Sequence, residues 1–231
     1  MNIKIYAVTA VALCLPLVCG AQSDEDIDAS TESSYDGLVQ VKKTGFRNVW
    51  VKPGTEAGSY NKILPVGVDF HYRDVPAGNR TAQARRSSST TDFPIEENTR
   101  ARIEEIMAEI FLEELGDTDN FTLTDEPGPD VVLIIGGLYD VVSNVPPDYI
   151  GRSNIYLSRV GQATLVLQIE DSMSREIIAR VVDRRAADPA FAQRSSTVTN
   201  TAEFRRLART WARILTNNID KWYESGGPDP E

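Results

Sequence analysis

The sequence predicts an α+β fold: an antiparallel or mixed β-sheet with two long amphipathic helices packed on one face. Three observations predict it. Segments with the period-two alternation of β-strands occur before and after a helical segment, and two long segments carry apolar residues at helical spacing. The regular strand–helix–strand alternation of a doubly wound sheet does not occur. The expected order is β–β–α–β–β–β–α.

The five strands of this order lie at 48–52, 63–73, 130–144, 162–171 and 176–183, and 121–124 is a candidate for a further short strand. The segment 130–144 begins with five apolar residues, so we expect it in the centre of the sheet, and Gly136-Gly137 suggests a bulge in it. The polar turn 171–174 joins the last two strands into a hairpin.

The two faces of this hairpin differ in polarity. The residues expected to face the helices are Ala163, Leu165, Leu167 and Ile169. The opposite face carries Thr164, Val166, Gln168 and Glu170, continued on the next strand by Ile178, Arg180, Val182 and Arg184. This second face is too apolar for free exposure to water, so we expect a loop, a partner or a second copy of the chain to cover it.

Both helices have an apolar stripe. The first, 95–115, places on one side Ile103, Ile106, Met107, Ile110 and Phe111. The second, 201–224, has a longer stripe: Phe204, Leu207, Ala208, Trp211, Ile214, Leu215, Ile219 and Trp222. Asn200 and Glu203 have the spacing of a capping box, which predicts the start of this helix.

The chain of 231 residues is long enough for one ordinary domain. We expect a signal peptide at 1–21, a disordered acidic tether at 22–36, a single α+β domain at 37–225 and a disordered tail at 226–231. Within the domain, 74–92 is a long loop, rich in Ser, Thr and Arg and without periodicity.

The first residues have the pattern of an export signal. Lys4 supplies a positive charge, 5–18 form an uncharged and largely apolar run, and Ala21 closes a cleavage site after it. A lipid on Cys19 is the alternative, although Val18 and Pro16 stand where lipoprotein signals prefer a small residue and leucine. Both cysteines of the chain precede the cleavage site, so the mature protein has no disulfide, cysteine-ligated metal or cysteine nucleophile.

Several short stretches are similar to one family of bacterial envelope proteins. They are SYDGL at 34–38, VWVKPG at 49–54, SYNK at 59–62, PGPDVV at 127–132, DVVSNVPP at 140–147 and VGQATL at 160–165. The chain resembles domain of unknown function 3313, whose members are mostly described as candidate lipoproteins. The resemblance implies an envelope location and no established activity, so there are no catalytic residues to carry over. The sequence departs from the family pattern at the lipid-attachment site.

Several classes of site lack the residues that they need. A net charge of −10 argues against nucleic-acid binding. The mature chain has one histidine and no cysteine, which is too few ligands for an ordinary zinc site. Asp117 and Asp119 lack the spacing of a calcium loop. No phosphate-binding glycine motif follows a strand. We therefore expect no metal and no cofactor.

His71 is the strongest candidate for acid–base chemistry. It shares a strand face with Asp69 and Arg73, so an Asp–His pair is geometrically feasible. No motif supplies a nucleophile, and a surface histidine on a strand explains the pattern equally well. We expect no catalytic residues, with an enzyme acting on a cell-envelope component as the alternative.

Four arginines form a stripe on the last helix: Arg205, Arg206, Arg209 and Arg213. At helical spacing they lie roughly opposite Trp211 and therefore face solvent. We interpret the stripe as a contact for an unknown protein or an anionic envelope component, and a solvated helix face is the alternative.

Together these observations favour a secreted, non-enzymatic binding or assembly module, periplasmic or associated with the outer membrane. The mature sequence has no apolar run long enough for a transmembrane helix. A lipid-anchored envelope protein is a second alternative.

Intact-mass spectrometry of the exported protein tests the cleavage site. We expect a chain that begins at Gln22 and carries no lipid, because Ala21 closes the signal segment. A diacylglyceryl group on Cys19 would instead establish the lipid-anchored alternative.

Overall fold

The computed structural model describes residues 34, 36–75, 92–146 and 156–226. The expected signal peptide, most of the acidic tether, most of the loop 74–92 and the tail 227–231 lie outside these residues. Asp36, the last residue of the expected tether, forms an ion pair with Arg180 on β8 at 2.7 Å.

The described residues form one mixed sheet of seven strands in the order β1-β2-β8-β7-β5-β3-β4. β3 runs parallel to β4 and β5, and the other neighbours pair antiparallel. The α+β class with a mixed sheet is thus confirmed. The strands are β1 (Val39–Val41), β2 (Asn48–Val51), β3 (Lys62–Tyr72), β4 (Thr122–Leu123), β5 (Val131–Ser143), β7 (Gly161–Asp171) and β8 (Ile177–Ala187). A separate pair consists of β6 (Tyr156–Leu157) and β9 (Gln193–Arg194).

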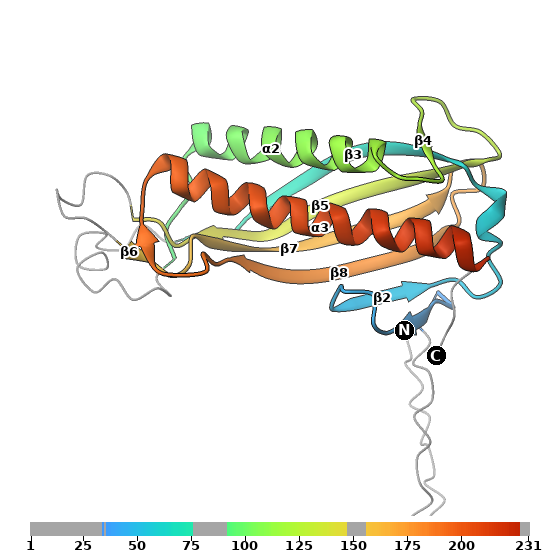
Figure 1. Ribbon diagram of the computed structural model, residues 1–231, viewed down its shortest axis with the longest axis horizontal. Coiled ribbons are helices and arrows are strands. Elements are labelled where there is room, and N and C mark those ends of the chain that lie inside the picture. The colour runs from blue at the N-terminus through green and yellow to red at the C-terminus, as the bar shows by residue number, and fades with distance from the viewer. Residues whose placement is uncertain (1–33, 35, 76–91, 147–155, 227–231) are drawn as a thin grey trace, which may run out of the picture. The chain divides into compact units, whose positions relative to one another are not determined.

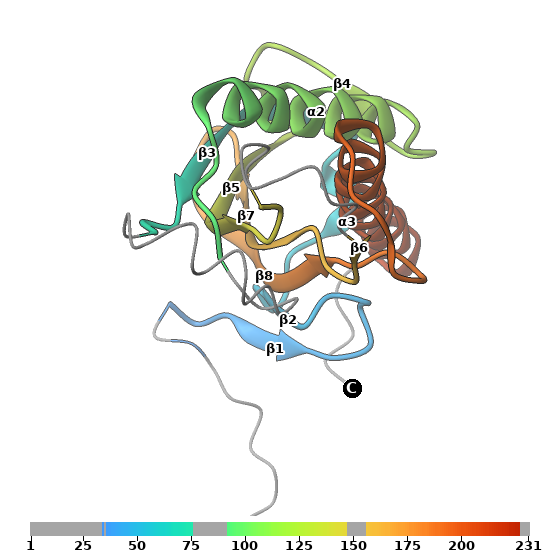
Figure 2. The same ribbon diagram turned by 90° about the vertical axis from the view of Figure 1, so that its left-hand side faces the viewer.

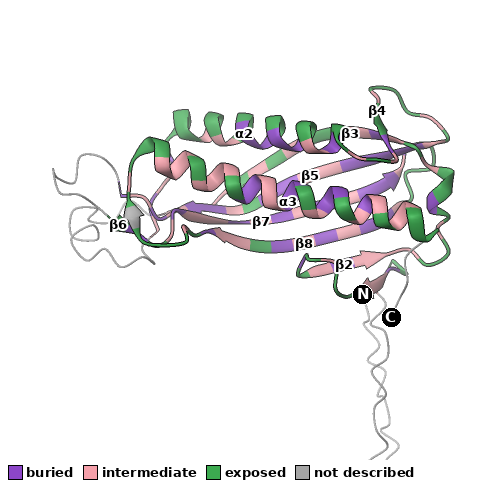
Figure 3. Cartoon of the chain, viewed as in Figure 1, coloured by how far each residue is buried: buried purple, intermediate pink, exposed green. Residues whose placement is uncertain are grey.

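Two long helices, α2 (Glu97–Gly116) and α3 (Thr197–Ser225), cover one face of the sheet, and a short 3₁₀ turn lies at η1 (Ala57–Ser59) (Figures 1 and 2). The buried surface follows the predicted stripes (Figure 3). The apolar residues buried on β7 are Ala163, Leu165, Leu167 and Ile169, and those buried on α2 include Ile106, Met107, Ile110 and Phe111. Apolar burial of this kind is the main favourable term in folding.

A buried hydrogen bond fixes the middle of α3 against the sheet. Trp211 is fully buried, and its indole N–H donates to Oδ2 of Asp183 on β8 at 2.8 Å. Asp183 is only 3% exposed, and it also accepts from the backbone N–H of Arg47 at 2.9 Å and from the guanidinium of Arg185 at 2.5 Å. This one carboxylate therefore links the helix, the sheet and the loop between β1 and β2.

The irregularity expected at Gly136-Gly137 lies in the ladder to β3, whose register shifts between Val66 and Val68, opposite Ile135 and Gly136. On the other side both glycines pair regularly with β7, and the irregularity of that ladder lies between Tyr139 and Val142. Asp140 there has a φ of 55°, a left-handed conformation that aspartate tolerates better than most residues. Gly137 instead provides space, because a Cβ at this position would lie 2.5 Å from the Tyr139 ring.

The predicted start of the last helix is also wrong. α3 begins at Thr197, and its capping box is formed by Ser196 and Thr199. Asn200 lies inside the first turn, where its backbone N–H donates to Ser196 and its side chain donates to Ser195. Ser196 and Thr199 cap the free backbone N–H groups at the start of the helix, as Asn200 and Glu203 were expected to do about one turn later.

Most of the residues expected on the outer face pair across β7 and β8, whereas Glu170 is buried and Ile178 belongs to the core. Thr164, Val166 and Gln168 pair across β7 and β8 with Arg184, Val182 and Arg180. Ile178 sits at a register shift, is 5% exposed and belongs to the core beneath the helices. The shift reverses the alternation at this one residue, which the regular pattern could not predict.

Replacing Asp183 with alanine tests the buried link. The change leaves the Trp211 indole and the Arg47 amide without their acceptor, so we expect the free energy of unfolding to fall by about 3 kcal/mol. Asp188→Ala is the control, because Asp188 is an exposed partner of Arg159 and should cost less than about 0.5 kcal/mol. Urea unfolding measures both values, and equal losses would contradict the role given to Asp183.

Candidate ligand-binding cleft

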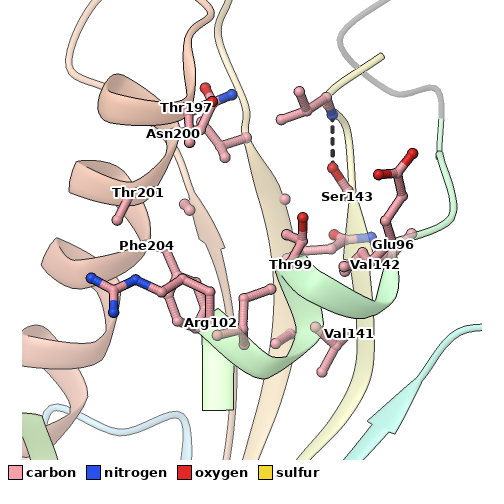
Figure 4. Close-up of a pocket in the computed structure, with 18 of the residues that line it drawn as sticks. Glu96, Thr99, Arg102, Val141, Val142, Ser143, Thr197, Asn200, Thr201 and Phe204 are labelled. Carbon is pink, nitrogen blue, oxygen red and sulfur yellow. Dashed lines mark hydrogen bonds between the residues drawn. The ribbon is translucent and has the colours of Figure 1, made fainter. Parts of the chain in front are cut away.

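A cleft of about 280 Å³ lies where the first turns of α2 and α3 meet one end of β5 and β7. We call it the helix-end cleft. Figure 4 shows Thr197, Asn200 and Thr201 on α3 at one side, and Glu96 and Thr99 at the start of α2 on the other. Its volume is close to the lower limit of ordinary ligand pockets, about 300 Å³.

Helical spacing places the side chains of the two helix walls. Thr197, Thr201 and Phe204 recur every three or four residues, so they share one face of α3. The residues of α2 that line the cleft, Thr99, Ile103 and Ile106, follow the same rule. The apolar residues of both stripes continue into the core, so the cleft has an apolar floor with polar groups near the helix ends.

The sheet wall of the cleft depends on the bulge in β5. Val141 and Val142 both line the cleft and are both buried, although neighbours in a regular strand point to opposite faces. Ser143 follows them, and its hydroxyl accepts a hydrogen bond from the backbone N–H of Val145 at 3.0 Å (Figure 4). Val141 belongs to the hydrophobic core, whereas Val142 is buried without joining that core, and both border the cleft.

An ionic cluster beside this wall holds the bulge. Arg73 donates to Asp140 at 2.6 Å and contacts Asp92 at 2.5 Å, and Arg184 reaches Asp140 at 3.1 Å. The hydrogen bond from Arg73 holds the pKa of Asp140 below its usual value. The Asp140 carboxylate therefore stays charged and paired at neutral pH.

Some polar side chains of the cleft have protein partners and others do not. Asn200 donates to Ser195 at 3.0 Å, and Arg102 is paired with Glu105. Within the described part of the chain, no side-chain hydrogen bond is made by Gln162, Thr197 or Thr201, all of which line the cleft. These amide and hydroxyl groups can donate to a ligand or accept from it.

The four arginines predicted as a partner site do not line the cleft. Each contacts a carboxylate of the protein: Arg205 pairs with Glu109 at 2.9 Å, Arg206 with Glu203 at 2.7 Å, and Arg209 and Arg213 with Glu114 at 3.5 and 3.2 Å. Three of these pairs join α3 to α2. An anionic partner at this stripe would therefore compete with the protein's own glutamates.

His71 and Asp69 are exposed on β3 and do not line the cleft. The His71 ring stacks on Tyr139 with centroids 4.5 Å apart. In the described residues, no group of three His, Cys, Asp or Glu side chains is placed to hold a metal ion. No helix among them is long and apolar enough to cross a membrane.

Sequence reasoning missed the residues of the cleft. Glu96, Gln162, Thr197 and Thr201 come from three separate segments, and none belongs to a recognisable motif. The one available sign was the cluster of Ser, Thr and Asn at 195–201, of which only Asn200 entered the prediction, as the start of a helix. The cleft residues lie close together because α2 and α3 both begin at the same end of the sheet.

Comparison with solved structures gives distant likenesses. A DUF330-family protein from Xanthomonas campestris is 12% identical, with 76% of this chain and 93% of that chain covered and a TM-score of 0.44. A PelC dodecamer from Paraburkholderia phytofirmans is 8% identical, covering 74% and 97%, with a TM-score of 0.34. A protein from Caulobacter crescentus described as a candidate lipoprotein is 10% identical, covering 70% and 93%, with a TM-score of 0.34. These values are too low to support a functional assignment.

Comparison with curated proteins gave no match. One family model matches residues 28–215, which is most of the chain and includes both walls of the cleft up to the middle of α3. Its description is "protein of unknown function", and it is the family that the short stretches resemble. The chain therefore belongs to the DUF3313 family.

Proposed function

We propose that this protein is a non-catalytic binding module of the bacterial envelope and that its ligand occupies the helix-end cleft. The observation that carries the proposal is the group of polar side chains without protein partners above an apolar floor. Gln162, Thr197 and Thr201 supply donors and acceptors, while Phe204 and Val142 supply apolar contact. An apolar pocket with a few convergent polar groups is the usual form of a ligand site.

The lining favours a ligand that is partly apolar and largely uncharged. Glu96 and Arg102 are the charged residues of the lining and have opposite signs, so neither an anion nor a cation is preferred. The amide of Gln162 and the two threonine hydroxyls can each donate and accept. A small amphipathic molecule or the end of a peptide fits these groups.

The chemistry of the lining also supports binding over catalysis. The only imidazole of the chain, on His71, lies on β3 away from these lining residues. Ser195 and Ser196 line the cleft, but their hydroxyls contact Asn200 and Thr199, which are not bases. The export signal read from residues 1–21 supports the envelope location.

The arginine stripe of α3 is a second surface of the same module. In the proposal it contributes less than the cleft, because its guanidinium groups are already paired with Glu109, Glu114 and Glu203. Surface ion pairs of this kind are weak, so a strongly anionic partner could displace them.

Native mass spectrometry of the full chain, isolated gently from bacteria that export it, tests the cleft. We expect a bound small molecule or peptide on the wild-type protein. Thr201→Trp should remove it, because an indole fills the space between the two helices. Ala202→Trp is the matched control: Ala202 is exposed and does not line the cleft, so the adduct should remain.

Two further variants separate the alternatives. If Arg206→Glu with Arg209→Glu removed the adduct while Thr201→Trp kept it, the stripe and not the cleft would be the binding surface. If His71→Ala caused an adduct to accumulate as uncleaved substrate, the enzyme alternative would replace the proposal. An adduct unchanged in every variant would also overturn it.

A further inference from the structure

A second hollow, of about 250 Å³, borders the other half of α3. We call it the tryptophan hollow, after Trp222. Its walls come from the C-terminal half of α3, from β2 and β8, and from the hairpin that joins β1 to β2. The apolar lining residues include Val41, Phe46, Val49, Ile178, Leu215, Ile219 and Trp222.

Trp222 is held in place as one wall. Its ring stacks on Tyr60 with centroids 6.0 Å apart, and the Tyr60 hydroxyl donates to Asp171 at 3.0 Å. Burial and this hydrogen bond raise the pKa of Tyr60 to about 12, so the phenol remains a donor at neutral pH. One turn before Trp222 on α3, the Asn218 amide donates to the backbone carbonyl of Thr44 at 2.8 Å and links the hairpin to the helix.

The charged residues of the lining are both lysines, Lys52 and Lys221, in a chain of net charge −10. Lys52 is paired with Glu176. Lys221 is exposed and has no carboxylate within ion-pair distance among the described residues. Lys42 and Lys43 lie in the hairpin loop between the lining residues Val41 and Thr44, and they too are exposed.

Thr44 adds a neutral polar group to the same wall. Its hydroxyl has no hydrogen-bond partner among the described residues, and its atom is shielded from solvent. An unsatisfied hydroxyl at such a position is unusual in a folded protein. Because this oxygen is almost inaccessible to solvent, polar recognition at the hollow depends on the lysines of its rim.

We propose that the tryptophan hollow binds a single-chain anionic amphiphile, with its acyl chain in the apolar interior and its carboxylate at the lysines of the rim. The apolar walls suit an acyl chain, and the positive charge of the rim lysines suits an anionic head group. The site is independent of the helix-end cleft, because Trp211 and its neighbours fill the core between the two segments of α3 that line them. The inference therefore goes beyond the proposed function and does not depend on it.

Isothermal titration of the full chain with dodecanoate, below its micelle concentration, tests the proposal. We expect one saturable site, and dodecyltrimethylammonium, which has the same chain and the opposite charge, should bind about tenfold more weakly or worse. Lys221→Glu should weaken dodecanoate about five- to tenfold, because it reverses the charge of an exposed rim residue without touching the core.

Val41→Trp tests the apolar interior. Val41 lines the hollow, whereas Gln40 does not, so Gln40→Trp places the same bulk on the neighbouring residue as a control. We expect Val41→Trp to weaken dodecanoate about tenfold or more and Gln40→Trp to leave it unchanged. Thr201→Trp, in the helix-end cleft, should also leave it unchanged, which keeps the failure of one proposal distinct from the failure of the other.

Three results would overturn the inference. Equal binding of the anionic and cationic amphiphiles would show non-specific apolar adsorption. Equal effects of Val41→Trp and Gln40→Trp would place the site elsewhere. Binding to phosphatidylglycerol vesicles without binding of monomeric dodecanoate would make the lysine rim a membrane contact and not the mouth of an acyl-chain site.

Discussion

The hydrogen bond between the Trp211 indole and the buried Asp183 carboxylate is the constraint on which the helical layer depends. It fixes the middle of α3 over β8, and the same carboxylate holds the β1–β2 loop through the Arg47 amide. A buried carboxylate is costly unless it is well paired, and three donors surround this one. Trp211 is itself fully buried in the hydrophobic core.

The position of Trp211 divides the inner stripe of α3 into two halves that line different cavities. Before it, Thr197, Thr201 and Phe204 border the helix-end cleft; after it, Leu215, Ile219 and Trp222 border the tryptophan hollow. The outer side of the helix carries the arginines that pair with α2. One helix thus packs in the core at its centre, lines a different cavity at each end and forms ion pairs with α2 along its side.

The regular parts of the fold could be predicted from the sequence because each follows a simple period. Alternation on β7 identified its buried face, and the stripe from Phe204 to Trp222 identified that of α3. The failures occur where a local interaction breaks the period. Ser196 and not Asn200 caps α3, an irregularity of β5 forms at Asp140 where no glycine indicates it, and a register shift turns Ile178 inward.

The candidate sites could not be predicted for a different physical reason. A cleft is defined by what packing leaves unfilled, and Gln162, Thr197 and Glu96 carry no pattern that distinguishes them from ordinary surface residues. The arginine stripe was visible because its charges share one helix face. Its glutamate partners lie mainly on another helix, about a hundred residues away in sequence, as the separation of 99 between Glu114 and Arg213 shows.

Hydrogen exchange of the three tryptophan indoles, followed by NMR, tests the central constraint most directly. If Asp183 fixes α3, the Trp211 indole N–H should exchange only through global unfolding, with an opening free energy equal to that measured by urea. The indoles of Trp50 and Trp222, which are only partly buried, should exchange faster. Exchange of Trp211 at the rate of Trp222 would show that the middle of α3 opens locally and would contradict the account.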